Sequence, residues 1–182
     1  MTARKPRGND DQLQQKAAGA SKPDLPKAVL LDLDGTVLTV TSGWTPESNA
    51  EWEQRTMNAS VIQLAAYVVL LLKQEGYRIV VLTARGMTCK KYTMRKLRET
   101  GLIELVDSVY HRPVRYKGMR SASYKEAMLR MLAKRYAFEH ALDDEDPNLE
   151  VFRKLGIPNI WDAKAFWDPK GFVGYDARKA ER

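Results

Sequence analysis

Short apolar runs alternate along the chain with longer amphipathic segments. The runs are rich in Val, Leu and Ile and are bounded by polar or glycine residues, which is typical of buried strands. They lie at residues 28–32, 78–83, 105–110, 138–142 and 157–161. Segments long enough for helices fill the intervals, and this alternation predicts βαβ units. The pattern therefore predicts an α/β, Rossmann-like fold in which helices cover both faces of a parallel sheet.

Capping patterns set the expected helix boundaries. The apolar stretch at 61–72 predicts a buried helix that stops at Gly76, and it is shorter than the roughly 20 residues that a membrane span requires. We therefore expect no membrane attachment. Helix starts are expected at Asn58, at the capping-box pair Ser123 and Glu126 of a helix over 124–136, and at Asp146 followed by Pro147.

Polar side chains follow the predicted strands at their carboxyl ends. Ligands of open parallel sheets bind beyond this edge of the sheet. The sequence therefore predicts a site where carboxylates, a hydroxyl group and cations meet at one rim. The residues are Asp32 with Asp34, Thr83 with Arg85, His111 with Arg112, and Asp143 with Asp144.

Carboxylates gathered at one rim need a compensating cation, because bare like charges would destabilise the fold. Mg²⁺ supplies that charge, since it binds hard oxygen ligands and often a substrate phosphate. Asp32 and Asp34 are two residues apart, so an extended backbone would aim both side chains the same way. Gly35 permits a sharp turn that brings backbone N–H groups near a phosphate. One aspartate could then attack phosphorus while a nearby carboxyl group transfers the protons.

Two further side chains suit a bound phosphate. Thr83 offers a hydroxyl donor to a phosphoryl oxygen. A lysine would offset the charge on nucleophile and phosphate, and Lys125 is the candidate, with Lys117 as the alternative. A lysine in the first turn of a helix opposes the helix dipole, but a phosphate bound in front of that helix end would reverse the effect.

The segment Asp32-Leu-Asp34-Gly35-Thr36 after an apolar strand resembles the first motif of the haloacid dehalogenase (HAD) phosphatase superfamily. Thr83, Lys125 and the pair at 143–144 are similar to its second, third and fourth motifs, in the same order, across residues 28 to about 163. The resemblance implies that Asp32 is the nucleophile and that Asp34 is the acid/base, which also offers its backbone carbonyl to Mg²⁺. It further implies that Thr83 and Lys125 hold the phosphoryl group, while Asp32, Asp143 and Asp144 ligate the metal.

A closer similarity is to the 3′-phosphatase domain of phage-type polynucleotide kinase-phosphatases. It rests on the run 79–85, the basic helix after it, His111 with Arg112, and the run 141–145. The second motif there tends to read Ser-Gly-Arg and the fourth Asp-Asp-Arg, where this chain has Thr-Ala-Arg and Asp-Asp-Glu. That family usually has an Asp shortly before the third-motif lysine, and this chain does not. The resemblance implies substrate contacts at Gly35, Thr36, Ala84, Arg85 and Arg112.

Charge narrows the substrate class. The chain carries a formal net charge of +7, and residues 85–135 hold 14 Lys or Arg against 4 Asp or Glu. Such a patch attracts phosphodiester backbones and predicts salt-sensitive binding. The motifs leave no room for a separate lid domain, so a minimal cap and an open mouth are expected, which suits the end of a polymer. The expected organisation is a basic arm at 1–27, a phosphatase domain at 28–163 and a C-terminal tail at 164–182.

These observations predict a Mg²⁺-dependent phosphatase that acts on a terminal phosphate of nucleic acid, specifically a polynucleotide 3′-phosphatase of DNA or RNA repair. Two alternatives stay open: a small-molecule nucleotidase of the same superfamily, and a basic nucleic-acid-binding or adaptor protein whose core no longer turns over. The single cysteine, Cys89, and the absence of a secretory pattern lead us to expect a cytoplasmic protein.

Overall fold

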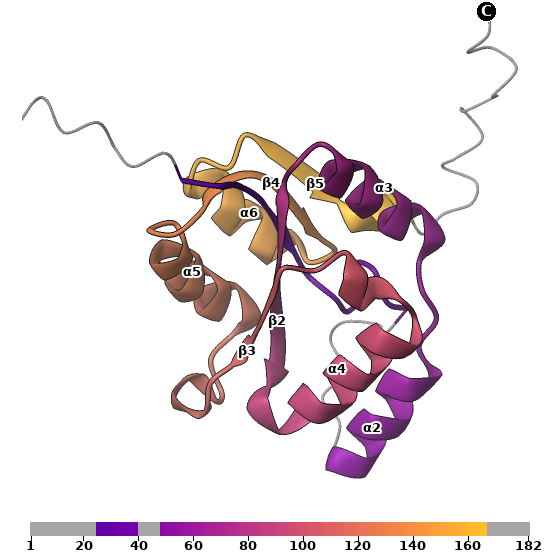
Figure 1. Ribbon diagram of the computed structural model, residues 1–182. Coiled ribbons are helices and arrows are strands. Elements are labelled where there is room, and N and C mark those ends of the chain that lie inside the picture. The colour runs from indigo at the N-terminus through magenta and orange to yellow at the C-terminus, as the bar shows by residue number, and fades with distance from the viewer. Residues whose placement is uncertain (1–24, 40–47, 167–182) are drawn as a thin grey trace, which may run out of the picture.

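The computed structural model describes residues 25–39 and 48–166. Its strands form one sheet in the order β3-β2-β1-β4-β5, and every neighbouring pair is parallel (Figure 1). The strand order reverses beside β1, which is where ligands of such sheets bind. The predicted α/β sheet is confirmed. The strands are β1 (Lys27–Leu31), β2 (Arg78–Gly86), β3 (Ser108–Arg112), β4 (Ala137–Asp143) and β5 (Asn159–Asp162).

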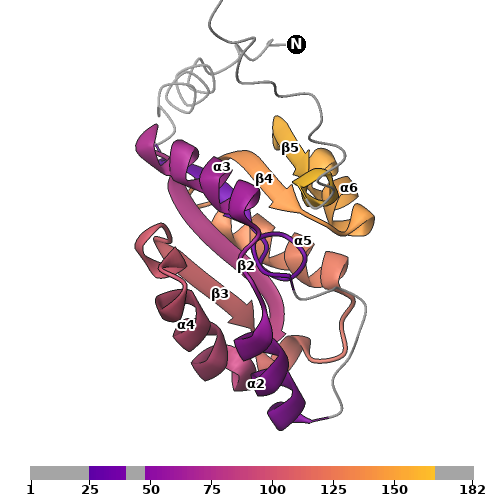
Figure 2. The same ribbon diagram turned by 90° about the vertical axis from the view of Figure 1, so that its right-hand side faces the viewer.

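Helices cover both faces of the sheet, as Figures 1 and 2 show. Side chains of β1 alternate between the faces: Val29 and Leu31 pack with α3 and α4, while Leu30 packs with α5 and α6. The helices are α2 (Asn49–Asn58), α3 (Gln63–Gln74), α4 (Lys90–Glu99), α5 (Ser121–Leu132) and α6 (Asp146–Lys154). Short 3₁₀ turns are η1 (Met87–Cys89), η2 (Leu102–Glu104), η3 (Val114–Tyr116) and η4 (Ala163–Phe166).

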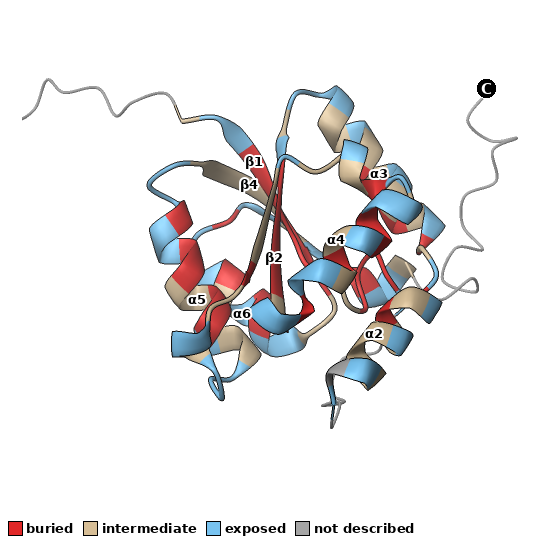
Figure 3. Cartoon of the chain, turned by 60° about the horizontal axis from the view of Figure 1, so that its bottom comes forward, coloured by how far each residue is buried: buried red, intermediate tan, exposed pale blue. Residues whose placement is uncertain are grey.

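Strands β1 and β2 are buried over most of their length, and Figure 3 shows these stretches in red. Residues 28–31 of β1 and 79–82 of β2 are at most 2% exposed. Strands covered on both faces read as continuous apolar runs, which explains why the sequence pattern located them. Neither stretch contains a polar residue, and Asp32 and Thr83 follow them directly at the carboxyl edge of the sheet.

Helix α2 was not predicted from the sequence, and it changes the start of α3. The expected cap Asn58 is wrong, because this residue ends α2 instead. Ser48 caps α2 through a capping box: its hydroxyl accepts from the Glu51 N–H at 3.2 Å, and the Glu51 carboxylate accepts from the Ser48 N–H at 3.0 Å. Helix α3 begins at Gln63 with no side-chain cap. Burial of its apolar face, not a cap, therefore stabilises α3.

Two further capping predictions are wrong, although α6 does begin at Asp146. Helix α5 begins ahead of Ser123 and Glu126 with no side-chain cap and ends at residue 132, so the expected capping box is absent there. At α6 the N-cap residue is Glu145, and the Asp146 side chain instead accepts a hydrogen bond from Lys164 Nζ at 2.6 Å. Strands β3 and β5 begin at 108 and 159, later than expected. Local capping signals thus place helix ends less well than apolar runs place the strands.

The expected arm at 1–27 and tail at 164–182 fall largely outside the described residues, so this division of the chain stays a prediction. The described start of the tail is η4, which packs on the core: the Phe166 ring centre lies 6.4 Å from that of Trp161. Among the described helices, none has the length and apolar character needed to cross a bilayer.

Candidate active site

Lys125 joins two carboxylates at the carboxyl edge of the sheet. Asp32 follows β1, Asp143 ends the neighbouring β4, and the Asp32 N–H donates to the Leu142 carbonyl at 3.0 Å. Lys125 Nζ lies 2.8 Å from Asp32 Oδ1 and 2.6 Å from Asp143 Oδ2. All three side chains are buried. Lys117 is exposed directly after η3, so Lys125 is the lysine that reaches the acids.

Burial and neighbouring charges shift the pKa values of Asp32 and Lys125. Burial raises the pKa of Asp32 well above its ordinary value; Lys125 opposes this shift and Asp143 adds to it. Burial alone would lower the pKa of Lys125, but Asp143 and Asp32 together raise it above its ordinary value, so the ammonium stays charged. One cation therefore faces two buried carboxylates, and a further cation would lower the repulsion between them.

Asp144 completes a group of three carboxylates. One oxygen each from Asp32, Asp143 and Asp144 lie within 4.8 Å of one another. Gly35 permits this approach, since its φ is +73° and a Cβ there would overlap the Asp144 carboxylate. Hard oxygen ligands at this spacing fit Mg²⁺. The Asp34 side chain is not part of the group, and a metal contact through its backbone carbonyl stays a prediction.

Asn148, on α6, orients Asp143 and was not among the predicted site residues. Its Nδ2 donates to Asp143 Oδ1 at 2.9 Å and to Glu145 Oε2 at 2.9 Å, while the Glu145 N–H donates to Asp143 Oδ1 at 3.0 Å. Asn148 is fully buried. These bonds leave Asp143 little freedom, which suits a carboxylate that holds an ion.

Asp34 forms a separate, two-pronged ion pair with Arg85. Arg85 Nε donates to Asp34 Oδ2 at 2.8 Å, and Nη2 donates to Oδ1 at 2.5 Å. The remaining Nη1 donates to Thr93 Oγ1 of α4 at 3.0 Å, and the guanidinium lies 5.7 Å from the centre of the Trp52 ring of α2. The Arg85 side chain is buried, where a place at the substrate rim was expected. This geometry suits Arg85 to positioning Asp34.

The hydroxyl of Thr83 contacts the backbone of Arg85. It is fully buried and accepts from the Arg85 N–H at 3.2 Å, so its own O–H proton is available to another acceptor. Thr36 is also buried, and its Oγ1 has no hydrogen-bond partner among the described residues. The Gly35 N–H donates to the Leu38 carbonyl at 2.9 Å, so it is not one of the backbone donors expected to face a phosphate.

Two expected substrate contacts remain. Ala84 is half-buried and packs against the apolar cluster that includes side chains of α5 and α6, and Arg112 is half-buried at the carboxyl end of β3. Neighbouring His111 is buried within β3. Burial, Arg85 and Lys90 lower its pKa to about 4, so the imidazole is neutral at physiological pH.

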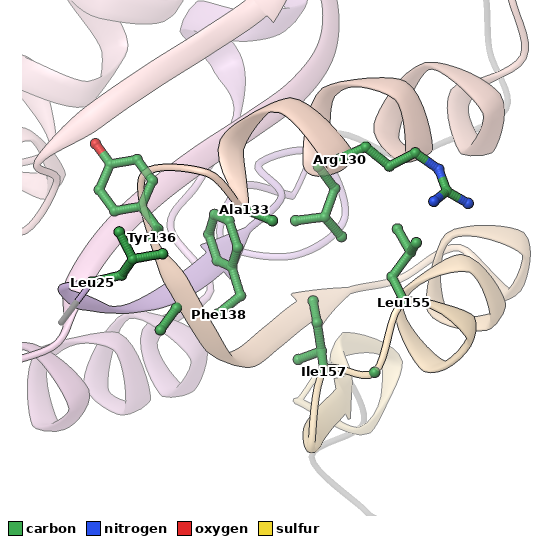
Figure 4. A pocket seen from close by; sticks show the side chains of 10 residues that line it. Leu25, Arg130, Ala133, Tyr136, Phe138, Leu155 and Ile157 are labelled. Carbon is green, nitrogen blue, oxygen red and sulfur yellow. The ribbon is translucent and has the colours of Figure 1, made fainter. Parts of the chain in front are cut away.

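A cavity of about 480 Å³ lies at the opposite edge of the sheet (Figure 4). Its lining is mostly apolar and contains no carboxylate, so phosphoryl chemistry does not belong there. Its lining residues are Leu25, Leu129, Arg130, Ala133, Tyr136, Ala137, Phe138, Leu155, Gly156 and Ile157.

Comparison with known proteins agrees with this geometry. A family model described as the polynucleotide kinase PNKP phosphatase domain matches residues 26–164. A solved Pnkp1/Rnl/Hen1 complex contains a chain that aligns with TM-score 0.62 and 26% identity over 76% of this chain and 46% of that chain. A structure titled as the Pnkp1/Rnl/Hen1 RNA repair complex aligns with TM-score 0.60 and 23% identity, over 76% and 42% of the two chains. This chain thus spans less than half the length of those relatives.

The fold extends to phosphatases of other kinds. The class C acid phosphatase from Bacillus anthracis with tungstate bound aligns with TM-score 0.53 and 18% identity, over 93% of this chain and 83% of that one. No match was found among curated proteins. The family model covers most of the chain and includes every acid of the site. The chain therefore belongs to the polynucleotide kinase PNKP phosphatase domain family and is a phosphatase of the HAD superfamily.

Proposed function

We propose that this protein is a Mg²⁺-dependent phosphomonoesterase that removes 3′-phosphates from nucleic-acid ends through an aspartyl-phosphate on Asp32. The observation that carries the proposal is the buried Lys125 bridge between Asp32 and Asp143, beside Asp144. It supports the proposal because this reaction needs a nucleophilic carboxylate, a compensating cation and oxygen ligands for a metal at one place, and these side chains meet at one edge of the sheet. The similar structure titled an RNA repair complex and the net charge of +7 support a nucleic-acid substrate.

Two steps account for the reaction. Asp32 attacks the terminal phosphorus while the bond from phosphorus to the sugar oxygen breaks, and Asp34 gives that oxygen a proton. Asp34 then takes a proton from a water molecule that attacks the same phosphorus, which releases phosphate and restores the Asp32 carboxylate. Lys125 and the Thr83 hydroxyl stabilise the charge on the phosphoryl oxygens. Mg²⁺ held by the three carboxylates would neutralise phosphate charge during both steps.

Arg85→Gln is expected to lower kcat on a 3′-phosphorylated oligonucleotide by about 100-fold and to change KM little, because it removes both bonds that hold Asp34. The defect should be much smaller on an aryl phosphate, whose good leaving group needs little help from an acid. Steady-state kinetics on the two substrates measure this difference.

Thr93→Val is the matched control for Arg85. It removes one hydrogen bond to the guanidinium and leaves both bonds to Asp34, so a change of only a few-fold in kcat is expected. An Arg85→Gln defect of equal size on both substrates would contradict a role in positioning the acid.

A phosphate-release panel tests the proposed function. The substrates are one oligonucleotide sequence with a 3′-phosphate or a 5′-phosphate, as DNA and as RNA, and free nucleoside monophosphates. Each is incubated with Mg²⁺ or with EDTA. Release from the 3′-phosphate substrates, only with Mg²⁺ and slower at high salt, is the expected result.

The other outcomes of the panel point to different functions. Release from free nucleotides but not from oligonucleotides would identify a nucleotidase. Tight oligonucleotide binding with no phosphate released in Mg²⁺ would identify a binding protein built on the same core.

A further inference from the structure

One amide group holds two carboxylates together beside the metal-binding acids. Asn148 Nδ2 donates to Asp143 Oδ1 at 2.9 Å and to Glu145 Oε2 at 2.9 Å. Asp143 belongs to the group of three carboxylates that fit a metal ion, and Glu145 does not. An amide NH₂ group has two protons, and both are used here. Two negative groups that would otherwise repel each other are therefore held against the same side chain.

The orientation of the Asn148 amide is fixed by these two hydrogen bonds. The side chain is fully buried on α6, and its Oδ1 has no hydrogen-bond partner among the described residues. An unpaired buried acceptor destabilises the fold, so packing alone does not explain an asparagine at this position. Hydrogen bonds to charged acceptors are stronger than those between neutral groups and offset this loss. The contacts to the two carboxylates therefore account for Asn148.

Glu145 is fixed beside Asp143 through its backbone and through its side chain. Its N–H donates to Asp143 Oδ1 at 3.0 Å, and its half-buried carboxylate accepts from Asn148. Among the described residues no ion pair includes Glu145, although its charge acts against the burial that lowers the Arg112 pKa. A negative charge held there, with no cation in direct contact, adds to the charge of the metal-binding acids.

Glu145 is also a position where this chain departs from the usual fourth motif of its family. That motif tends to read Asp-Asp-Arg, and this chain has Asp-Asp-Glu at 143–145. The change replaces a positive charge next to the acids by a negative one. The affinity of an oxygen site for a divalent cation depends on the negative charge of the site and on the rigidity of its ligands. The Asn148 amide increases both, because it fixes Asp143 and keeps Glu145 close.

We propose that Asn148 is a positioning residue that holds Glu145 against Asp143, so that the Glu145 charge strengthens metal binding although Glu145 is not a ligand. This inference rests on the Mg²⁺ dependence in the proposed function. Glu145 supplies the charge and Asn148 fixes its place.

Calorimetric titration of the substrate-free protein with Mg²⁺ tests the role of Glu145. Glu145→Gln should weaken Mg²⁺ binding about fivefold, because it removes the charge and keeps the size of the side chain. Glu145→Arg reverses the charge and should weaken binding by about a further fivefold. Both differences should shrink at high salt, since the group is partly exposed.

Glu150→Gln is the matched control for this series. Glu150 is an exposed carboxylate on the same helix and lies 3.7 Å from Lys154 Nζ, away from the acids. Its replacement should leave Mg²⁺ binding unchanged.

Asn148→Ala tests whether the two carboxylates act through one amide. It should weaken Mg²⁺ binding about tenfold. Adding Glu145→Gln to this variant should weaken binding by no more than about a further twofold, because Glu145 is then no longer held, whereas independent roles would multiply to about fiftyfold. Asn159→Ala, which removes a hydrogen bond to the Glu139 carbonyl at the amino end of β5, should change nothing. Asn148→Ser takes the place of Asn148→Ala if that variant does not fold.

Three results would overturn the proposal: wild-type affinity for Mg²⁺ in Glu145→Gln, tighter binding in Glu145→Arg, or effects of the two positions that multiply fully. Failure of the proposed function would look different. A wild-type protein that binds Mg²⁺ but releases no phosphate from any oligonucleotide would overturn that function and leave this inference standing. A wild-type protein that binds no Mg²⁺ would overturn the Mg²⁺ dependence and this inference together.

Discussion

Lys125→Met should lower the free energy of unfolding of the metal-free protein by about 3–5 kcal/mol. Lys125 Nζ contacts Asp32 at 2.8 Å and Asp143 at 2.6 Å, and both carboxylates are buried. Removing the ammonium leaves two buried carboxylates facing each other. The folded variant must then either tolerate the repulsion between them or bind a proton on one of them. Urea denaturation without metal measures the loss. Mg²⁺ should recover part of the stability, because it supplies positive charge to the same carboxylates, but turnover should stay low.

Lys96→Met provides the matched control. Lys96 is also a buried lysine, but its Nζ donates to the Met57 carbonyl at 2.8 Å and has no carboxylate partner among the residues that the structure describes. Its replacement should cost about 1–2 kcal/mol, with no dependence on Mg²⁺. If Lys125→Met cost no more than Lys96→Met and responded no more to Mg²⁺, the bridge would not be the main compensation for the buried acids.

The sequence located the acids because each follows a strand that is buried on both faces. Such strands read as unbroken apolar runs, and the first polar residue after each run marks the carboxyl edge of the sheet. Asp32 and Asp143 could be placed at the same rim of the sheet for this reason, although more than a hundred residues separate them. Charge compensation left both Lys125 and Lys117 open, and only the resemblance favoured Lys125, since its side chain reaches the site from a helix whose exact start the capping signals missed.

Other contacts could not be predicted, because the same local sequence pattern occurs around a residue whether its side chain is solvated or buried. Arg85 follows an apolar run in a basic segment, which describes a solvated rim arginine as well as one buried against Asp34, 51 residues earlier. Asn148 reads as an ordinary polar position of a helix. Its role depends on how close α6 approaches β4, which is a matter of packing. The available signal for Asn148 was that a polar residue stands at a helical position that faces the core.

Asp32→Asn should abolish turnover, by about 10⁴-fold or more, because the amide cannot attack phosphorus. The same change should make the metal-free protein more stable at neutral pH. Burial raises the pKa of Asp32 above its ordinary 3.8, so the folded protein binds a proton more tightly than the unfolded chain does. The stability of the wild type therefore falls as pH rises from about 4 through the folded pKa, and the variant lacks this loss. Asn Oδ1 can still accept from Lys125.

Urea denaturation across this pH range, with and without Mg²⁺, checks the prediction. The advantage of Asp32→Asn over wild type should grow with pH in EDTA and shrink in Mg²⁺, because the metal stabilises the wild-type carboxylate more than the amide. Asp146→Asn is the control, since Asp146 is exposed and forms a surface ion pair with Lys164, so little change in stability or activity is expected. An Asp32→Asn protein that is less stable than wild type in EDTA, yet gains as much from Mg²⁺, would show that Asp32 is neither under electrostatic strain nor a ligand. The burial of Asp32 and the negative charges around it would then not destabilise the fold.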